Sequence, residues 1–438
     1  MTRCHEYSDS PFELNLLQRF FFPANKPGAG PAPSDSPPPR PVNRRFRPAL
    51  WAYLAALAAL LTLTLAACTG RDIGGVSSGW NALTASDGVV YVGTKDGGVQ
   101  ALQDGDSDVP ATVWRFPRSD SNSSEDLRGV FGAPLVAEGL LFVAAENGFL
   151  YALDPENGSS DDRGWRRPRG QPQDLAPMVA GPAYDPINRL VLAPSEDGKL
   201  YAYIADSGEA AETWARAFQA GDKIWSSPVV ATLDGIAMAW FGSHDHRIYA
   251  INVSTGEEIW NYRTGGVVAG RPLLFDGMVI AGSFDKKLYA LDARDGSLLW
   301  DFEGGNWFWA GAVTNGDTVF APNMDGSVYA LSRDGILRWQ YDSGAPIVSR
   351  PALVPAGLAA ANRNGELILL DVSRGDSQRE LRKLTLGDAE ITAPLYAVGD
   401  SIFVGSQDGS VRRVDATARR PLEEWWCWHP ENDNNRCN

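Results

Sequence analysis

The sequence predicts an all-β fold, an eight-bladed β-propeller of four-stranded antiparallel blades, and two repeating features predict it. The first is a turn-and-strand segment that recurs eight times along the 438 residues. Intervals of 39 to 51 residues separate its shared acidic or amide residue, which occupies positions Asp96, Asn147, Asp197, Asp245, Asp285, Asp325, Asn364 and Asp408. Repeats of this length are typical of tandem supersecondary units that cannot bury their faces alone.

The second feature is the pattern of short β-rich stretches within each unit. Around Asp285, the run 277–283 precedes the turn and the segment LDARDGSLLW at 291–300 follows it. β-Branched and aromatic stretches separated by Asp-Gly, Asn-Gly or Thr-Gly turns predict four strands per unit. We expect the first turn of each unit at the acidic or amide position. A ring of eight such sheets buries the faces of each sheet against its neighbours.

Recurring aromatic residues are expected to hold the blades together. A large flat ring buried between two sheets is a major stabilising contribution. A ligand site needs asymmetry, which a residue repeated in most units does not provide, so we interpret these aromatic residues as structural. The tryptophans are Trp114, Trp214, Trp260, Trp300 and Trp339, with Trp165 and either Trp425 or Trp426 as further candidates, and the tyrosines are Tyr151, Tyr201, Tyr249, Tyr289 and Tyr329.

The pattern Asp-Gly-x-Leu-Tyr-Ala-Leu-Asp-x-x-x-Gly-x-x-x-Trp resembles the tryptophan-docking repeat of the pyrroloquinoline-quinone-like β-propeller superfamily. The resemblance covers about residues 76–428 and is more specific for the fold than for an activity. The superfamily includes eight-bladed quinoprotein dehydrogenases. It also includes cofactor-free relatives such as BamB, the lipoprotein propeller of the outer-membrane β-barrel assembly machine.

The N-terminal region predicts export and a lipid anchor. Residues 1–48 are a disordered n-region rich in Pro, Ser and Arg, whose length also fits a start codon assigned too early, and residues 49–67 are the apolar segment of a signal peptide. Leu65-Ala66-Ala67-Cys68 resembles a bacterial lipobox, so Cys68 is the predicted lipidation site. The alternative is an uncleaved signal anchor, because nineteen apolar residues could just span a bilayer.

The rest of the chain divides into a tether at 68–78, the propeller at 79–428 and a tail at 429–438. A lipid followed by a propeller predicts an extracytoplasmic protein anchored to a bacterial membrane, on the periplasmic face or the cell surface. Residues 1–67 hold seven basic and four acidic residues, so the remainder has 32 Lys and Arg against 50 Asp and Glu, a net charge of −18. This charge argues against binding to nucleic acid or to an anionic membrane surface.

Two of the four cysteines lie near the C-terminus. In an oxidising compartment Cys427 and Cys437 are expected to form a disulfide. The alternative is a metal site that also uses His429, for which the sequence shows no fourth ligand.

The strongest asymmetric signal lies on the innermost strands. Most units carry small or aliphatic residues just before a recurrent proline position, but some carry tryptophan or arginine there. These exceptions predict a recognition site at the mouth of the central channel, for an extended peptide, a glycan or an acidic group. The alternative is that they fill the channel, with the arginines paired to neighbouring carboxylates. The five residues are Trp80, Trp225, Trp309, Arg271 and Arg350.

No catalytic, cofactor-binding or metal site is predicted. The quinoprotein enzymes of the superfamily typically use a vicinal cysteine disulfide, a calcium ion and an aspartate base, whereas this sequence has no Cys-Cys pair and is far shorter. The acidic segment 104–108 lacks the glycine and glutamate of a calcium loop. His244 and His246 flank the repeat residue Asp245 and are interpreted as parts of a plain turn, with metal binding as the alternative.

These observations favour a membrane-anchored, cofactor-free lipoprotein that acts as a protein-interaction scaffold, similar to BamB, in outer-membrane protein assembly or another envelope complex. Its expected partners are envelope proteins and, through the lipid, the membrane, but not nucleic acid. The alternative is a propeller that senses a small ligand or a glycan. A quinone-dependent oxidoreductase is disfavoured, so we expect no enzymatic activity.

Overall fold

The computed structural model describes residues 82–94, 97–105, 107–118, 126–160, 164–168, 175–373, 380–417, 423–430 and 437. These residues form 32 β-strands in eight four-stranded sheets, and each sheet follows the order of the chain. They contain no helix, and hence none long and apolar enough to cross a membrane. The predicted eight-bladed, all-β propeller is therefore confirmed. The predicted n-region, signal segment and tether lie outside these ranges.

The strands of blades 1 to 4 are β1 (Leu83–Ser86), β2 (Val89–Gly93), β3 (Val99–Gln103), β4 (Thr112–Phe116), β5 (Leu135–Ala137), β6 (Leu140–Ala144), β7 (Leu150–Leu153), β8 (Trp165–Arg167), β9 (Ala183–Asp185), β10 (Leu190–Pro194), β11 (Lys199–Ile204), β12 (Phe218–Gln219), β13 (Val229–Leu233), β14 (Ile236–Ser243), β15 (Arg247–Asn252) and β16 (Glu258–Arg263). Those of blades 5 to 8 are β17 (Leu273–Phe275), β18 (Met278–Gly282), β19 (Lys287–Asp292), β20 (Leu298–Glu303), β21 (Val313–Thr314), β22 (Thr318–Pro322), β23 (Ser327–Ser332), β24 (Leu337–Asp342), β25 (Ala352–Val354), β26 (Gly357–Ala361), β27 (Glu366–Leu370), β28 (Glu380–Thr385), β29 (Tyr396–Val398), β30 (Ser401–Gly405), β31 (Val411–Asp415) and β32 (Glu423–Trp428).

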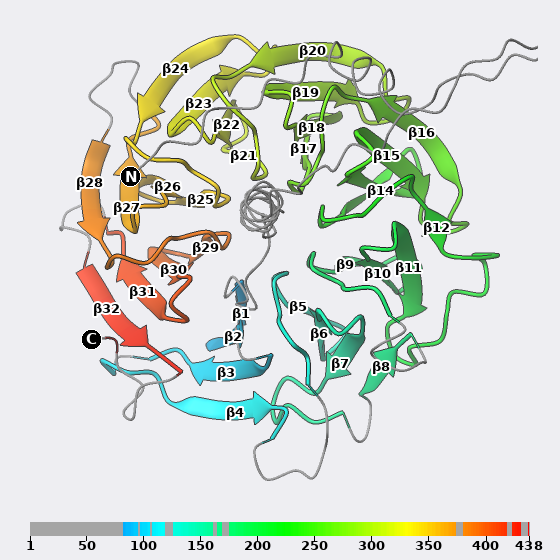
Figure 1. The fold of residues 1–438 in the computed structure, drawn as a ribbon, viewed down its shortest axis with the longest axis horizontal. Helices are drawn as coiled ribbons and strands as arrows, with labels where there is room; N and C mark the ends of the chain where they lie inside the picture. The colour runs from blue at the N-terminus through cyan, green and yellow to red at the C-terminus, as the bar shows by residue number, and fades with distance from the viewer. Residues whose placement is uncertain are drawn as a thin grey trace, which may run out of the picture. The chain divides into compact units, whose positions relative to one another are not determined.

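The eight sheets of the propeller unit are arranged as blades around a common centre, with the first strand of each blade innermost and the fourth outermost (Figure 1). The second and third strands are almost fully buried, whereas fourth strands such as β20 alternate between exposed and half-buried residues. Each inner strand therefore packs on both faces against neighbouring blades. This explains the continuous apolar runs, such as Met278–Gly282, in the middle of each unit.

The turn at the repeat acid is the second turn of each blade, not the first as the sequence suggested. Asp285 lies between β18 and β19, because the short innermost strand β17 adds a hairpin ahead of it. That first hairpin turns at Asp276 and Gly277, whose φ angles of 49° and 77° match the Asp-Gly turns that suit twisted strands. The other repeat positions follow the same pattern, except Asp96, which lies outside the described residues.

The repeated tryptophans pack between neighbouring blades, as predicted. Trp260 of blade 4 is 7% exposed and lies in one hydrophobic cluster with residues of β18 and β19 in blade 5. Its Nε1 donates to the Ala293 carbonyl oxygen at 3.1 Å, and a Cβ atom on Gly296 would lie 2.6 Å from its ring. Each ring thus docks on the third turn of the next blade, where glycine leaves room for it. Equivalent pairs are Trp114 with Gly158, Trp165 with Gly208, Trp214 with Gly256, and Trp300 with Gly335.

The interface between blades 7 and 8 departs from this pattern. Arg382 occupies the tryptophan position of β28, opposite Leu369 in the strand register, and its Nη1 donates to the Thr417 carbonyl oxygen. Aliphatic residues of β26, β27 and β30 fill the rest of this interface. The single missing tryptophan is therefore compensated by apolar packing and by an arginine that reaches the same part of the next blade.

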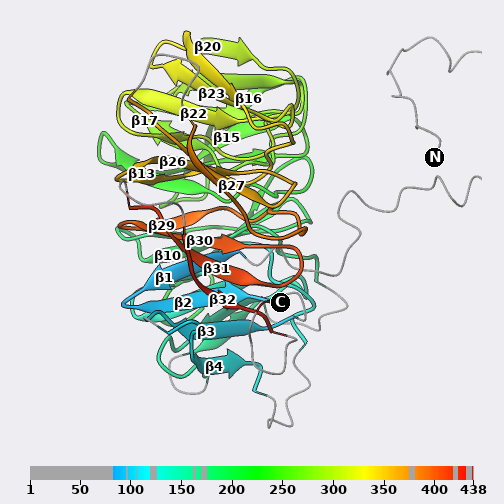
Figure 2. The same ribbon diagram turned by 90° about the vertical axis from the view of Figure 1, so that its left-hand side faces the viewer.

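The ring closes between blade 8 and blade 1 through side chains, because all four strands of each blade are consecutive in the chain. The two blades lie side by side in both views of the propeller (Figures 1 and 2). Trp426 is buried in their shared cluster, and its Nε1 donates to Asp104 Oδ1 at 3.2 Å. Asp104 also forms a 2.7 Å ion pair with Arg413. Trp426 is thus the wedge of the closing interface.

Candidate functional site

The propeller has two faces that differ in the segments they present. Because the strands of a blade are consecutive and antiparallel, the first and third turns lie at one end of the strands, and we call this end the turn face. The second turns and the loops between blades lie at the other end, which we call the loop face. Hydrogen bonds within the loop face support the assignment. For example, Gly265 N, between blades 4 and 5, donates to Asp285 Oδ2 at 2.6 Å.

The turn face is held by exposed ion pairs between neighbouring blades. Arg294 of blade 5 pairs with Asp234 of blade 4 at 2.6 Å, and Arg333 of blade 6 pairs with Asp276 of blade 5. All four side chains are more than half exposed. Such pairs contribute about 0–1 kcal/mol each. The turn face is therefore a solvated, charge-paired surface.

The repeat acids of the loop face are structural. Asp285 Oδ2 accepts a hydrogen bond of 2.6 Å from the Tyr289 hydroxyl as well as the bond from Gly265. Burial, reinforced by the hydrogen bond to the aspartate, raises the pKa of the Tyr289 hydroxyl, so it stays a donor at neutral pH. The same tyrosine-to-acid bond occurs in blades 3, 4 and 6. The repeated tyrosines therefore fix the second turns, as their repetition suggested.

Trp225 belongs to a mixed aromatic and charged cluster on the loop face. It lies in the loop between blades 3 and 4, and its Nε1 donates to Glu196 Oε1 of blade 3 at 2.7 Å. Its ring meets the His244 ring edge to face, with centroids 4.4 Å apart. Lys223 Nζ lies 5.7 Å from the Trp225 ring centroid and 3.4 Å from Glu196 Oε2. Burial lowers the pKa of His244, so its imidazole is neutral at pH 7, and its Nε2 has no hydrogen-bond partner.

A second aromatic group lies on the loop face of blade 5 and the loop that follows it. Phe284, in the second turn of blade 5, stacks with Trp307 at a centroid distance of 4.7 Å and with Trp309 at 5.1 Å. All three side chains are half-buried. The loop 264–272 between blades 4 and 5 joins the two second turns, because Thr264 N donates to the His246 carbonyl oxygen and Phe284 N donates to the Val267 carbonyl oxygen, both at 2.9 Å. We call the two groups on either side of this loop the aromatic patch, defined by Trp225, His244, Phe284, Trp307 and Trp309.

The innermost segments approach each other backbone to backbone, which explains their small residues. A Cβ atom on Gly132 would lie 2.2 Å from Gly181 N, and one on Gly311 would lie 2.3 Å from the Arg271 carbonyl oxygen. Larger side chains cannot be accommodated toward the neighbouring blade at these two glycines. Arg271 and Arg350 precede the innermost strands of blades 5 and 7 and are the large polar exceptions in this region.

A family model described as outer membrane protein assembly factor BamB matches residues 64–233 and 211–422. The chain belongs to this family. This match confirms the resemblance to the pyrroloquinoline-quinone-like β-propeller superfamily that the repeat indicated. Among curated protein sequences, none matches the chain.

Solved structures agree with the family's fold. BamB from Moraxella catarrhalis superposes with a TM-score of 0.61 at 17% identity, over 77% of this chain and 94% of that chain. The computationally designed Ika8 protein superposes with a TM-score of 0.60 at 16% identity, over 78% of this chain and 97% of that chain. At these identities the likeness shows the propeller fold alone.

The structure describes four of the five residues of the predicted channel-mouth site, Trp225, Trp309, Arg271 and Arg350. Trp225 and Trp309 belong to the aromatic patch, where they contact second turns of blades 3, 4 and 5. The charge of Arg271 contributes to a lowered pKa of Arg350, and we return to these two residues below. Trp80 and the predicted lipidation site Cys68 lie outside the described residues.

Sequence reasoning missed Phe284, Trp307 and the role of His244. Phe284 and His244 each stand directly before the repeat acid, in two successive units, and are aromatic where blades 2 and 3 carry Glu146 and Glu196. The position directly before the repeat acid is therefore where the sequence could have revealed these two aromatic residues. Across the part of the chain that the structure describes, no three His, Cys, Asp or Glu side chains gather in a way that could hold a metal ion.

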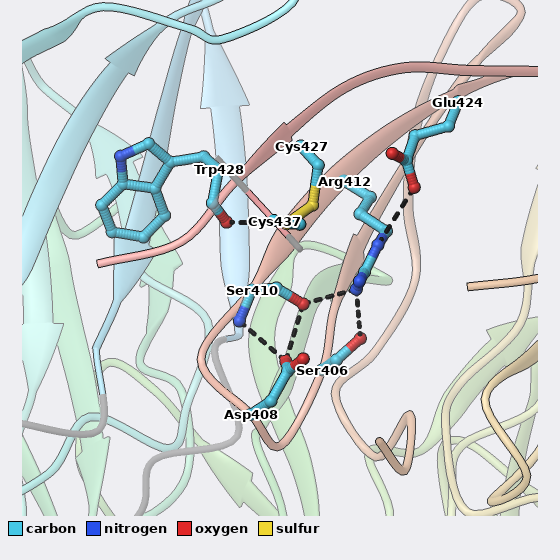
Figure 3. Close-up of a disulfide and its surroundings, with 8 residues drawn as sticks. All are labelled: Ser406, Asp408, Ser410, Arg412, Glu424, Cys427, Trp428 and Cys437. Carbon is cyan, nitrogen blue, oxygen red and sulfur yellow. Dashed lines mark hydrogen bonds and ion pairs between the residues drawn. A yellow bond between two sulfur atoms is a disulfide. The ribbon is translucent and has the colours of Figure 1, made fainter. Parts of the chain in front are cut away.

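The C-terminal cysteines are joined in the structure. A disulfide links Cys427 of β32 to Cys437, with Cα atoms 5.6 Å apart (Figure 3). Beside it, the buried Arg412 pairs with Glu424 at 3.1 Å, and its Nη1 also donates to Ser406 and Ser410. This arginine has its hydrogen bonds satisfied within blade 8, so it is a structural group.

Proposed function

We propose that this protein is a membrane-anchored, extracytoplasmic scaffold that binds other envelope proteins through the loop face of its propeller, without a cofactor and without catalysis. The observation that best supports this proposal is the aromatic patch, whose half-buried rings lie on blades 4 and 5 and on the loops before and after them. Tryptophan and other aromatic residues are enriched at the centres of protein interfaces, where they supply large contact areas.

Two further observations support this proposal. The turn face carries exposed ion pairs that already satisfy each other, whereas the loop face combines the aromatic patch with charged groups such as Lys223 and Glu196 at its edge. An apolar centre with a charged rim is the usual composition of a specific interface. The family's description as an outer membrane protein assembly factor supports envelope proteins as the class of partner.

The proposal is tested by affinity capture. Tagged full-length chain is purified from native membranes in mild detergent, and co-purifying proteins are quantified for the natural sequence and for Trp307→Ala with Trp309→Ala. We expect a protein partner that the double variant retains about ten-fold less or worse, because central aromatic residues dominate binding energy.

The control for this experiment is Arg294→Ala with Arg333→Ala, which removes two exposed pairs from the turn face and should leave capture unchanged. Melting temperatures of both variants separate a loss of binding from a loss of folding. Equal capture by the natural sequence and the Trp307 and Trp309 variant would show that the aromatic patch is not the binding surface.

The lipid anchor gives a separate prediction. If Cys68 is lipidated, Cys68→Ser should leave the precursor unprocessed and abolish labelling with a fatty-acid analogue, because the thiol is the acceptor. Labelling and precursor size are read on the same gel, with the natural sequence alongside. Labelling that persists in the variant would support the signal-anchor alternative or another acceptor.

A further inference from the structure

The segments before the innermost strands of blades 5, 6 and 7 place two arginines around a glycine. Arg271, Gly311 and Arg350 occupy the same position of three consecutive units, separated by one residue from the start of β17, β21 and β25. Blade 6 separates the two arginines, and at Gly311 it contributes no side chain. Arg271 still acts electrostatically on Arg350 across this blade. The shared space that allows this is the inner channel, which all innermost segments border.

Neither arginine is matched by an acid in the described part of the chain. The Arg271 side chain is exposed, its guanidinium pKa is lowered by partial desolvation, and no carboxylate opposes the shift. Burial and the charge of Arg271 lower the pKa of Arg350 to about 10. Arginine is protonated at pH 7, so both groups carry a positive charge. Arg350 Nε is buried and has no hydrogen-bond partner. The alternative in which the arginines pair with neighbouring carboxylates gains no support from these contacts.

We propose that the inner channel holds an oxyanion, a carboxylate or phosphate group, between Arg271 and Arg350. Two like charges brought together without a counter-ion destabilise the fold, and a buried donor left unsatisfied destabilises it further. A bound oxyanion removes both costs. The planar guanidinium presents paired N–H donors that match the two oxygens of a carboxylate or phosphate, so these groups bind better than a halide.

This site and the aromatic patch use different residues. Arg271 and Arg350 lie just before innermost strands, whereas His244 and Phe284 lie in second turns. Trp309 lies two residues before Gly311, so the two sites are neighbours. A small anion, or an acidic group on a larger ligand, could occupy the channel while a protein covers the patch. The inference therefore adds a ligand site to the protein and does not depend on the proposed scaffold function.

Calorimetric titration of the purified full-length chain, in detergent at low salt and without any partner, tests the site. The probes are succinate and inorganic phosphate, with sodium chloride at matched ionic strength. We expect saturable binding of at least one oxyanion, weakened about ten-fold or more by Arg271→Gln with Arg350→Gln, because the variant loses the charge-assisted hydrogen bonds of both guanidinium groups. The relative response to succinate and phosphate identifies the preferred oxyanion.

Two variants keep this test interpretable. Arg350→Gln alone retains one charge and should weaken binding by an intermediate factor, and Arg263→Gln, which changes an exposed arginine on β16, should not change it. Without added anion, the double variant should melt at or above the temperature of the natural sequence, because the repulsion is gone. General stabilisation by phosphate or succinate would appear equally in all variants. No saturable binding, or binding unchanged in the double variant, would overturn the proposal and leave the scaffold proposal standing.

Discussion

Replacing Trp260 with alanine is expected to lower the free energy of unfolding by about 3–5 kcal/mol, the cost of removing a large buried aromatic side chain. Trp260 is 7% exposed, fills the interface between blades 4 and 5, and donates a hydrogen bond to Ala293 O. The neighbouring sheets are fixed by their own ladders and cannot collapse into the space. Denaturant unfolding, followed by far-ultraviolet circular dichroism, measures the change.

The docking partner of this ring provides a sharper form of the same test. Gly296 has a φ of 74°, and its Cβ would lie 2.6 Å from the Trp260 ring, whereas Gly277 has a φ of 77° and open space around it. Alanine at either position costs about 1–2 kcal/mol for the left-handed backbone conformation. Only Gly296→Ala should cost more than this, through the clash with the ring.

A double-mutant cycle then isolates the docking contact. In the Trp260→Ala background the clash is removed, so Gly296→Ala should cost only what Gly277→Ala costs. Equal effects of Gly296→Ala and Gly277→Ala in the natural background would contradict tryptophan docking on the third turn. A loss below about 1 kcal/mol for Trp260→Ala would do the same.

Much of the fold could be predicted because the same repeat occurs eight times in the sequence. The repeat fixed the number of blades, and the aromatic spacing predicted the wedges, including Trp426 as one of two candidates. The predicted position of the repeat acid within the blade was wrong by one hairpin, because this residue lies in the second turn and not in the first. The innermost strands, such as β21 with two residues, are too short to show a strand pattern of their own.

The candidate site was harder to predict, because it depends on exceptions to the repeat. Phe284 stacks with tryptophans that follow it by 23 and 25 residues, in a loop whose path no local pattern specifies. Trp225 was found because it replaces a small residue, but its partner Glu196 belongs to the preceding blade. The relation between Arg271 and Arg350 likewise requires the ring geometry, since the two are 79 residues apart.

The loop face as a protein-binding surface is tested most directly by photo-cross-linking in living cells. A photoreactive amino acid replaces Lys286, in the second turn of blade 5, or Asp276, in its first turn; both residues are exposed and lie at opposite ends of β18. We expect a discrete cross-linked protein from position 286 on the loop face and none from position 276 on the turn face. A discrete adduct from position 276, with none from position 286, would contradict the proposed binding surface.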